Sequence, residues 1–443
     1  MVNDLTKGTI WKKLLFFAIP MLLSSLVQQL YNTVDLIFVG NFVDKSASAA
    51  VGTSGLLITC LVGFFGGMSV GAGVVVAQIF GAGDDDGLRR ALHTAITFSL
   101  IGGVALTFIG WVLGPVYLRL VNTPADIMES ALSYLRIYFI SMVSVVTYNM
   151  GAGVLRSLGD SRSPLYAQFI GGLFNVGADY VFIRILDVGV NGAAYATMIS
   201  QTIAMLVVLY RLARLDEAYA LRIGRLRIDG GLLSKMVKLG VTAGVQALVI
   251  TLSNVFIQHH INGFGKDAIA AFAAYFKVEL IIYLPIVAFG QAIMAFAGQN
   301  MGAGDTERVF KGTRICVIMS VALAAVSSVF CLAAGPVLFR AFSNDPEVIA
   351  VGCRISRVTF PFYCIYPVMQ LLADSLRGCG RVREPMLIVL INMCVIRTII
   401  LFTVSPLIPD VRGVAMTYPV TWALTAICMT IYYFSFRRRI ERG

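Results

Sequence analysis

The chain consists mainly of long apolar segments separated by short polar breaks that are rich in Gly, Asp and Arg. Most segments reach about 20 residues, the length that an α-helix needs to cross ~30 Å of hydrocarbon. They lack the period-2 alternation of barrel strands, and a helix satisfies its own backbone groups in lipid. We therefore expect twelve transmembrane helices, at residues 12–38, 50–78, 91–116, 131–155, 165–186, 192–211, 236–260, 268–299, 312–335, 350–376, 385–404 and 413–436.

The polar breaks repeat along the chain. Residues 77–84 (AQIFGAGD) return as residues 298–305 (GQNMGAGD), at an offset of 221 residues. The same offset aligns Arg136 with Arg357, Arg156 with Arg377, Gly159 with Gly380, Pro164 with Pro385 and Gly192 with Gly413. A register kept without insertion indicates two copies of one structural unit, which in a membrane chain is typical of a secondary transporter.

The number of crossings sets the orientation of the second copy. Six crossings return the chain to the side where it began, so the repeats are parallel. We expect an all-α polytopic membrane protein with two six-helix lobes, related by a pseudo-two-fold axis along the membrane normal. The lobes are residues 1–210 and 236–443, and the charged segment 211–235 is the linker between them. The amphipathic middle of this linker is suited to lie on the membrane surface.

Composition and charge support this assignment. The chain is 58 % hydrophobic and only 13 % charged, too few polar side chains to cover a water-soluble protein of 443 residues. Its net charge of +11 is concentrated at both termini, in the linker and in the even-numbered loops. The positive-inside rule then places both termini and the linker in the cytoplasm. Because the basic residues are dispersed over alternate loops, we expect no nucleic-acid partner.

Ionisable residues inside the predicted spans are the best candidates for function. An unpaired charge at a helix centre costs about 2.5–3.5 kcal/mol on insertion scales, so such residues usually mark a pathway. Asp35 and Asp179 both lie on outward-running spans, roughly 7 and 12 Å below the outer ends at ~1.5 Å per residue. Thr197, on the returning sixth span, lies at a similar depth. We expect these three side chains to share one level of the first lobe.

Amides accompany the two carboxylates at helical spacing. Gln28, Asn32 and Asp35 follow the pattern i, i+4, i+7, and Asn175 precedes Asp179 by four residues. Such stripes are typical of helices that line a cavity, although they also occur where polar residues only hold helices together. Two neighbouring carboxylates resist being ionised together, so a shared proton or a captured cation would relieve them.

These motifs together resemble one known family. The Q-x-x-GAGD pattern after the second and eighth spans, the segments 155–160 (LRSLGD) and 376–380 (LRGCG), Asp35, and the pair Asn175/Asp179 are similar to those of multidrug and toxic compound extrusion (MATE) transporters. The resemblance covers nearly the whole chain and is greatest to the DinF-like and staphylococcal-type bacterial multidrug branch. Taken alone, each GAGD is only a turn with an Asp that caps the next helix.

The resemblance implies roles for individual residues. In similar transporters the corresponding side chains bind the coupling proton or sodium ion, and here they are Asp35, Asn175, Asp179 and Thr197. Sodium, if it is the coupling ion, would bind at Asp35 and Asp179; no other metal and no cofactor are expected. Another branch places its cation site on acids of the seventh and tenth spans. This sequence departs from that pattern, because its seventh span has no carboxylate and Asp374 lies near the cytoplasmic end of the tenth.

The same resemblance implies an exporter. We expect a cation-coupled antiporter of amphipathic, often cationic drugs, working by alternating access as a monomer in the bacterial plasma (inner) membrane. Glu279 is expected to take part in gating or in the substrate cavity, and its i, i+2 neighbour Lys277 does not face it. The residues expected to line the substrate cavity are Gln28, Asn32, Tyr148, Asn149, Phe276, Lys277, Glu279 and Tyr283.

Three alternative functions fit the sequence less well. A lipid-linked oligosaccharide flippase of the same superfamily needs a cavity rich in Arg and Lys, and few basic residues lie within the spans. A channel has no evident need for two six-helix halves with buried acids in one of them. An enzyme is not indicated, because the sequence has no Ser-His, HExxH or clustered-carboxylate motif.

Overall fold

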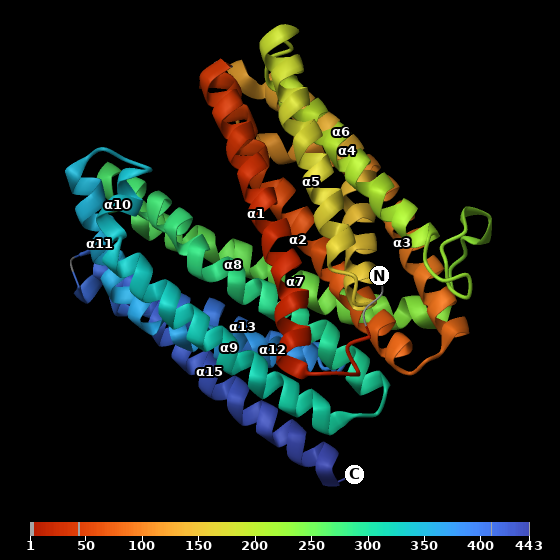
Figure 1. Ribbon diagram of the computed structural model, residues 1–443. Coiled ribbons are helices and arrows are strands. Elements are labelled where there is room, and N and C mark those ends of the chain that lie inside the picture. The colour runs from red at the N-terminus through yellow and green to blue at the C-terminus, as the bar shows by residue number, and fades with distance from the viewer. Residues whose placement is uncertain (1–3, 43–44, 409, 443) are drawn as a thin grey trace. The chain divides into compact units, whose positions relative to one another are not determined.

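The computed structural model describes residues 4–42, 45–408 and 410–442, and the chain runs through these almost entirely as helices (Figure 1). The helices of the first repeat and the short turn after it are α1 (Ile10–Phe42), α2 (Lys45–Gly81), α3 (Asp85–Leu120), α4 (Ala125–Ser157), α5 (Arg162–Asp179), the π-helix η1 (Tyr180–Ile185), α6 (Val190–Ala213) and the 3-10 turn η2 (Ile223–Arg225). Those of the second repeat are α7 (Gly230–Asn262), α8 (Lys266–Gly302), α9 (Thr306–Ala333), α10 (Gly335–Arg340), α11 (Pro346–Thr359), the 3-10 segment η3 (Phe360–Ile365), α12 (Tyr366–Gly378), α13 (Arg383–Leu390), the π-helix η4 (Ile391–Ile396), α14 (Arg397–Thr403), η5 (Ser405–Leu407) and α15 (Val411–Arg442).

The predicted all-α membrane architecture is confirmed. Within the described ranges, eleven helical segments are long and apolar enough to cross a membrane. The fifth predicted span, 165–186, is not among these eleven and corresponds to α5 and its direct continuation η1. The tenth span is less regular than expected, because Pro361 and Pro367 interrupt helical hydrogen bonding and leave the 3-10 segment η3 between α11 and α12.

The two copies share the geometry of their turns. Gly83 and Gly304 both adopt the left-handed conformation, with φ of 71° and 77°. Each is followed by an Asp that caps the next helix: Asp84 Oδ1 accepts from the N–H of Gly87 at 2.8 Å, and Asp305 Oδ1 accepts from that of Arg308 at 2.9 Å. The sequence prediction of a turn with a capping Asp is therefore confirmed at both sites.

The helices form two compact units. Unit 1 contains Leu23–Gly244, and unit 2 contains Leu5–Leu22 together with Val245–Gly443. These boundaries differ from the division at residues 210 and 236 expected from the repeat. The first half of α1 belongs to unit 2, and the first half of α7 belongs to unit 1.

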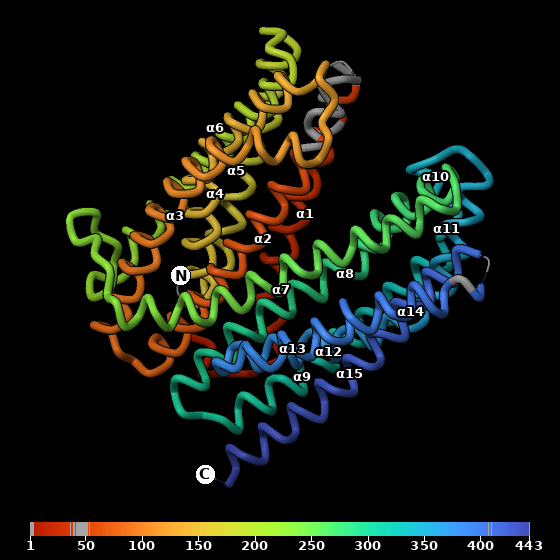
Figure 2. The backbone as a smooth tube through the Cα atoms, turned by 180° about the vertical axis from the view of Figure 1, so that it is seen from behind, coloured from red at the N-terminus to blue at the C-terminus, as the bar shows by residue number. Residues whose placement is uncertain are grey.

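In unit 1, α4 is the central helix and packs on α2, α3 and α6, while α5 lies along α6 (Figure 2). The first half of α7 joins this unit through a close backbone contact with α2. Gly67 meets Gly244, and Gly71 meets Gly240, with no room for a Cβ atom at either position. Both helices thus use a small-xxx-small pattern of the kind that lets membrane helices approach closely.

In unit 2, the Leu5–Leu22 segment packs on α8. Phe17 and Met21 are buried in one apolar cluster with Phe289 and Phe296. The segment is also held by polar contacts, because the Leu5 N–H donates to Gln299 Oε1 at 2.9 Å. The beginning of the chain is therefore an integral part of the core of unit 2.

The linker packs against its own unit. Helix α6 continues to Ala213 and α7 begins at Gly230, and the only helical segment that the structure describes between them is the three-residue η2. Tyr219, Ala220 and Leu221 are buried in the core of unit 1. The amphipathic middle therefore does not form a helix of its own but packs back onto its own unit.

Candidate functional site

The two predicted carboxylates of unit 1 come together. Asp35 from α1 and Asp179 from the last turn of α5 interact directly through their side chains. Asp179 is fully buried, and Asp35 is half-buried. As two carboxylates they have no proton to donate to each other, and neither oxygen of Asp179 has a hydrogen-bond partner. A buried acid pair of this kind is unfavourable until a proton or a cation is added.

Asn175, one turn before Asp179, completes the group. It is fully buried, and its side chain lies close enough to interact with the Asp35 carboxylate. Neither its Nδ2 nor its Oδ1, however, has a hydrogen-bond partner of ordinary geometry. Buried polar atoms are normally paired, so this set of orphaned atoms on α1 and α5 marks a place where a ligand would be stabilised. The carboxylate and amide oxygens of this group can bind either a proton or a sodium ion.

Three tyrosines surround the acid pair, and the sequence analysis missed them. Tyr31 of α1 and Tyr134 and Tyr138 of α4 are all close enough for electrostatic interaction with Asp35, and Tyr134 also with Asp179. The hydroxyl of Tyr31 accepts a hydrogen bond of 3.0 Å from Gln168 Nε2. No sequence signal separates these rings from the many aromatic residues of the other spans.

Other predicted residues of unit 1 occupy different surroundings. Thr197 on α6 is half-buried, and no contact of its hydroxyl with the acid pair is seen in the described residues. Gln28 and Asn32 are exposed on α1, and Gln28 reaches Tyr31. Tyr148 is buried, whereas the amide of Asn149 donates to the carbonyl of Val145 in its own helix at 2.8 Å. Their assignments remain predictions.

Unit 2 contains a cavity of about 370 Å³ with a strongly aromatic lining. Its walls come from α7, α8, η3, α12, η4, α14 and α15. The lining includes three of the residues expected for a substrate cavity, Phe276, Glu279 and Tyr283. It also includes the aromatic residues Tyr363, Tyr366, Tyr418 and Trp422. Rings packed in this way offer flat apolar faces to a bound aromatic group.

Glu279 is the acid of this cavity. Its Oε1 accepts hydrogen bonds from the hydroxyls of Tyr363 at 3.0 Å and Tyr275 at 3.3 Å. The Tyr275 hydroxyl also lies 3.0 Å from Thr359 Oγ1, which ties the network to α11. Two tyrosine donors hold the carboxylate in a fixed orientation at the cavity wall.

Arg397 is the cation of the same cavity, and it was not among the predicted site residues. It is buried, its guanidinium lies 4.8 Å from the centre of the Tyr418 ring, and its Nη2 donates to Thr421 Oγ1 at 2.9 Å. Glu279 and Arg397 act on each other electrostatically, but no salt bridge between them appears in the described residues. Both charges thus remain available to a bound molecule.

Two further ionisable residues of unit 2 lie elsewhere. Lys277 is exposed and does not line this cavity. Asp374 forms a salt bridge of 2.6 Å with Arg377, whose Nη2 donates to Gln246 at 2.9 Å. Asp374 is therefore engaged in holding α12 to the second half of α7.

Buried acids within apolar spanning helices, carried on a duplicated helical scaffold, define the class of the molecule as a polytopic membrane transporter. The sequence matches the MatE family over residues 20–181 and 243–403, one match in each repeat. The chain belongs to this family, and the resemblance noted from its motifs is confirmed.

Known relatives extend over the whole chain. It is 26 % identical to "Probable multidrug resistance protein YoeA" of Bacillus subtilis (strain 168), covering 97 % of this chain and 94 % of that protein. It is 28 % identical to "Probable multidrug resistance protein YpnP" of the same organism, covering 89 % and 88 %. A solved structure, the "outward-facing conformation of a multidrug resistance MATE family transporter of the MOP superfamily", matches with a TM-score of 0.93 at 21 % identity, covering 100 % of this chain and 99 % of that one. The fold is therefore the two-lobe MATE fold.

Proposed function

We propose that the protein is a cation-coupled multidrug exporter, an antiporter that exchanges a proton or a sodium ion for amphipathic, often cationic compounds by alternating access. The observation that carries the proposal is the group of Asp35, Asp179 and Asn175, in which one oxygen of Asp35, both oxygens of Asp179 and both polar atoms of Asn175 are buried without a hydrogen-bond partner. Relatives named as multidrug resistance proteins support the substrate class. We place the protein as a monomer in a bacterial plasma membrane, with both termini and the linker in the cytoplasm.

Coupling follows from the physics of the acid pair. When the site is empty, the two acidic groups resist being ionised together in a buried setting. A proton or sodium ion stabilises the conformation in which the acid pair is closed around the ion. The drug stabilises the alternative conformation of the transporter. Two ligands that favour opposite states of one equilibrium drive each other's release, which is antiport.

The cavity of unit 2 is the proposed substrate site. Its aromatic walls suit a flat ring system, and Glu279 supplies the negative charge that a cationic group needs. Arg397 in the same wall supplies a second anchor for compounds that also carry an acidic group. This arrangement favours monocationic and zwitterionic aromatic compounds over multiply charged cations.

Transport in proteoliposomes tests the proposal. Purified protein is reconstituted, a fluorescent organic cation is supplied, and a pH gradient and then a sodium gradient are imposed. We expect uphill export with at least one gradient, and its loss in Asp35→Asn and in Asp179→Asn. Asp126→Asn, which removes an exposed acid at the start of α4, serves as the matched control and should transport normally.

Two results would contradict the proposal. Uphill export that persists in both aspartate variants would remove the acid pair from the coupling mechanism. Flux that runs only down the gradient of the organic cation, and that does not change when a pH or sodium gradient is imposed, would instead indicate a channel.

A further inference from the structure

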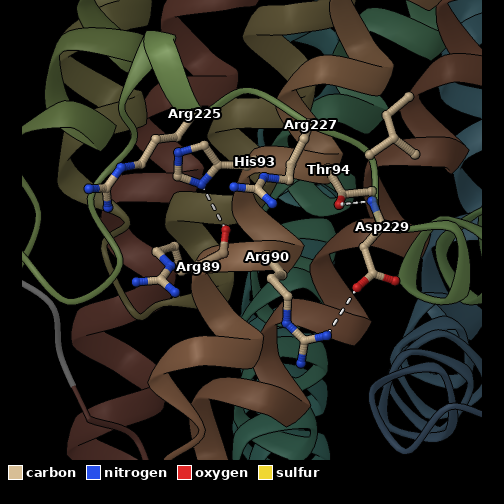
Figure 3. Close-up of a pocket in the computed structure, with 8 residues that line it drawn as sticks. Arg89, Arg90, His93, Thr94, Arg225, Arg227 and Asp229 are labelled. Carbon is tan, nitrogen blue, oxygen red and sulfur yellow. Dashed lines mark hydrogen bonds and ion pairs between the residues drawn. The ribbon is translucent and has the colours of Figure 1, made fainter.

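A second cavity lies between the start of α3 and the linker, within unit 1 (Figure 3). It has a volume of about 320 Å³. Four of its lining residues are arginines: Arg89 and Arg90 from α3, and Arg225 and Arg227 from the linker. Asp229 is its one acidic lining residue. Four cations around a small cavity make it a place where an anion would be attracted.

The ion pairs inside the cavity leave a positive excess. Arg90 is paired with Asp229 at 3.1 Å, as Figure 3 shows. Arg89 pairs with Asp86 at 2.8 Å, but Asp86 is 79 % exposed and such a surface pair is weak. Arg225 and Arg227 form no ion pair with any residue that the structure describes. Two guanidinium groups therefore face this cavity without a counter-charge.

The backbone that carries these arginines is fixed in place. Nε2 of His93 accepts from the N–H of Arg222 at 3.1 Å, while Nδ1 of the same ring donates to the Arg89 carbonyl at 2.8 Å. Farther along, Thr94 Oγ1 accepts from the N–H of Asp229 at 3.0 Å. The linker is thus tied to α3 on both sides of Arg225 and Arg227. A site arranged before its ligand arrives loses less entropy on binding.

Exposed aliphatic side chains accompany the unpaired arginines. Ile223, in the same 3-10 turn as Arg225, is 84 % exposed, and Ile228, next to Arg227, is 41 % exposed. Isolated surface isoleucines are common, but here both adjoin basic residues at the end of a membrane-spanning bundle. Basic and apolar residues side by side are typical of a segment that meets lipid head groups.

We propose that this cavity binds a phosphate group, and that its main source is the head group of an anionic membrane phospholipid. Guanidinium groups bind phosphate through paired, charge-assisted hydrogen bonds, and Arg225 and Arg227 are the two groups free to form them. Ile223 and Ile228 would lie toward the lipid. The site is separate from the proposed coupling and substrate sites and does not depend on them.

The test uses the purified full-length protein in a neutral detergent. Its thermal unfolding midpoint is measured with increasing inorganic phosphate, against chloride at the same ionic strength. In a second series, phosphatidylglycerol replaces an increasing share of the phosphatidylcholine in mixed micelles with the detergent. The test variant is Arg225→Gln/Arg227→Gln. The control variant is Arg214→Gln/Arg222→Gln, which loses the same charge from linker side chains that do not line the cavity.

We expect phosphatidylglycerol to raise the midpoint of the unmodified protein and of the control, and the test variant to need at least about tenfold more lipid. Native mass spectrometry of the unmodified protein, which should retain phosphatidylglycerol in preference to phosphatidylcholine, makes the result independent of how the variant folds. A response to inorganic phosphate alone, lost in the test variant, would assign the same cavity to a soluble phosphate. Equal responses in all three proteins, or no response to either probe, would overturn the proposal.

Discussion

Unit 1 and unit 2 keep their shared turns in the same backbone conformation, whereas their buried side chains differ. Gly159 and Gly380, which the 221-residue offset aligns, have φ of 81° and 83°. The same offset aligns Asp35 with Phe256 and Asp179 with Ile400. The second copy therefore has no acid pair, although its helices follow the same plan.

Two aromatic residues of the cavity in unit 2 are replaced by polar residues in unit 1. Tyr418 and Trp422 of unit 2 align with Thr197 and Gln201 of unit 1. After duplication, each copy kept the turns and caps that build the bundle, and their interiors diverged in chemistry. Under the proposed function, the acid pair of one copy binds the ion and the aromatic cavity of the other binds the substrate.

Both units place a π-helix next to their buried charge. In unit 1, η1 follows Asp179 directly, and in unit 2, η4 ends directly before Arg397. By the offset, η4 aligns with residues 170–175, so the two π segments are not inherited from one ancestral feature. A π segment shifts the helical register locally and is frequent at functional sites.

The largest effect should come from the acid pair. Asp35→Asn, Asp179→Asn and the double variant are each expected to abolish uphill export, because the two carboxyls act as one site and their effects are not additive. The measurement is ion-driven accumulation in proteoliposomes. A double variant that is clearly worse than either single variant would mean that the two acids bind ions separately.

The next effect concerns the packing that differs between the units. Gly71→Ala should lower the free energy of unfolding by about 1–3 kcal/mol, because its Cβ would meet the backbone of Gly240. In unit 2 the aligned residue is already an alanine, Ala292, and Ala292→Gly should cost about 1 kcal/mol or less. Thermal unfolding in detergent compares the two. Equal losses would show that the glycine contact of unit 1 is not specific.

Glu279→Gln should have a more selective effect. The amide keeps an acceptor for Tyr363 but removes the charge, so we expect KM for an organic cation to rise about tenfold while coupling to the ion gradient is retained. Proteoliposome kinetics with a cationic and a neutral substrate of similar shape distinguish charge recognition from a structural role. An equal loss for both substrates would argue for a structural role in place of charge recognition.

The smallest effect should appear at the linker. The backbone N–H of Leu232 and the neighbouring Arg90 hold the pKa of the Asp229 carboxyl below its usual value. A lowered pKa stabilises the folded state above the unfolded value of about 4, and this contribution is lost as the pH falls through the folded value. The difference in unfolding midpoint between the protein and Asp229→Asn should therefore be present near neutral pH and disappear in acid. A difference that persists in acid would contradict this account.

Much of the molecule could be predicted from its sequence. Apolar length predicted the spans, the offset of 221 residues predicted the duplication, and the rise per residue of a helix predicted that Asp35 and Asp179 lie at one level. The fold of the capped turns followed from Gly83 and Asp84, because few residues suit those positions. These features depend on local chemistry or on simple periodicity.

The remaining features depend on tertiary packing. Nothing in the sequence distinguishes Tyr134 beside the acids from a tyrosine that faces lipid, or Arg397 in a cavity from one at a helix end. The basic cavity required knowing that the linker folds back onto α3, which Thr94 and Asp229 help to fix. The division of α1 and α7 between the units likewise has no periodic signal, since the repeat boundary lies elsewhere.

The position of Leu5–Leu22 has a consequence for biosynthesis. This segment is translated well before the helices on which it packs, which follow residue 245. At ~5–20 residues per second, it waits on the order of ten seconds or longer for them. Until then, the buried partners that Phe17 and Met21 have in the finished unit 2, among them Phe289 and Phe296, are absent from the nascent chain.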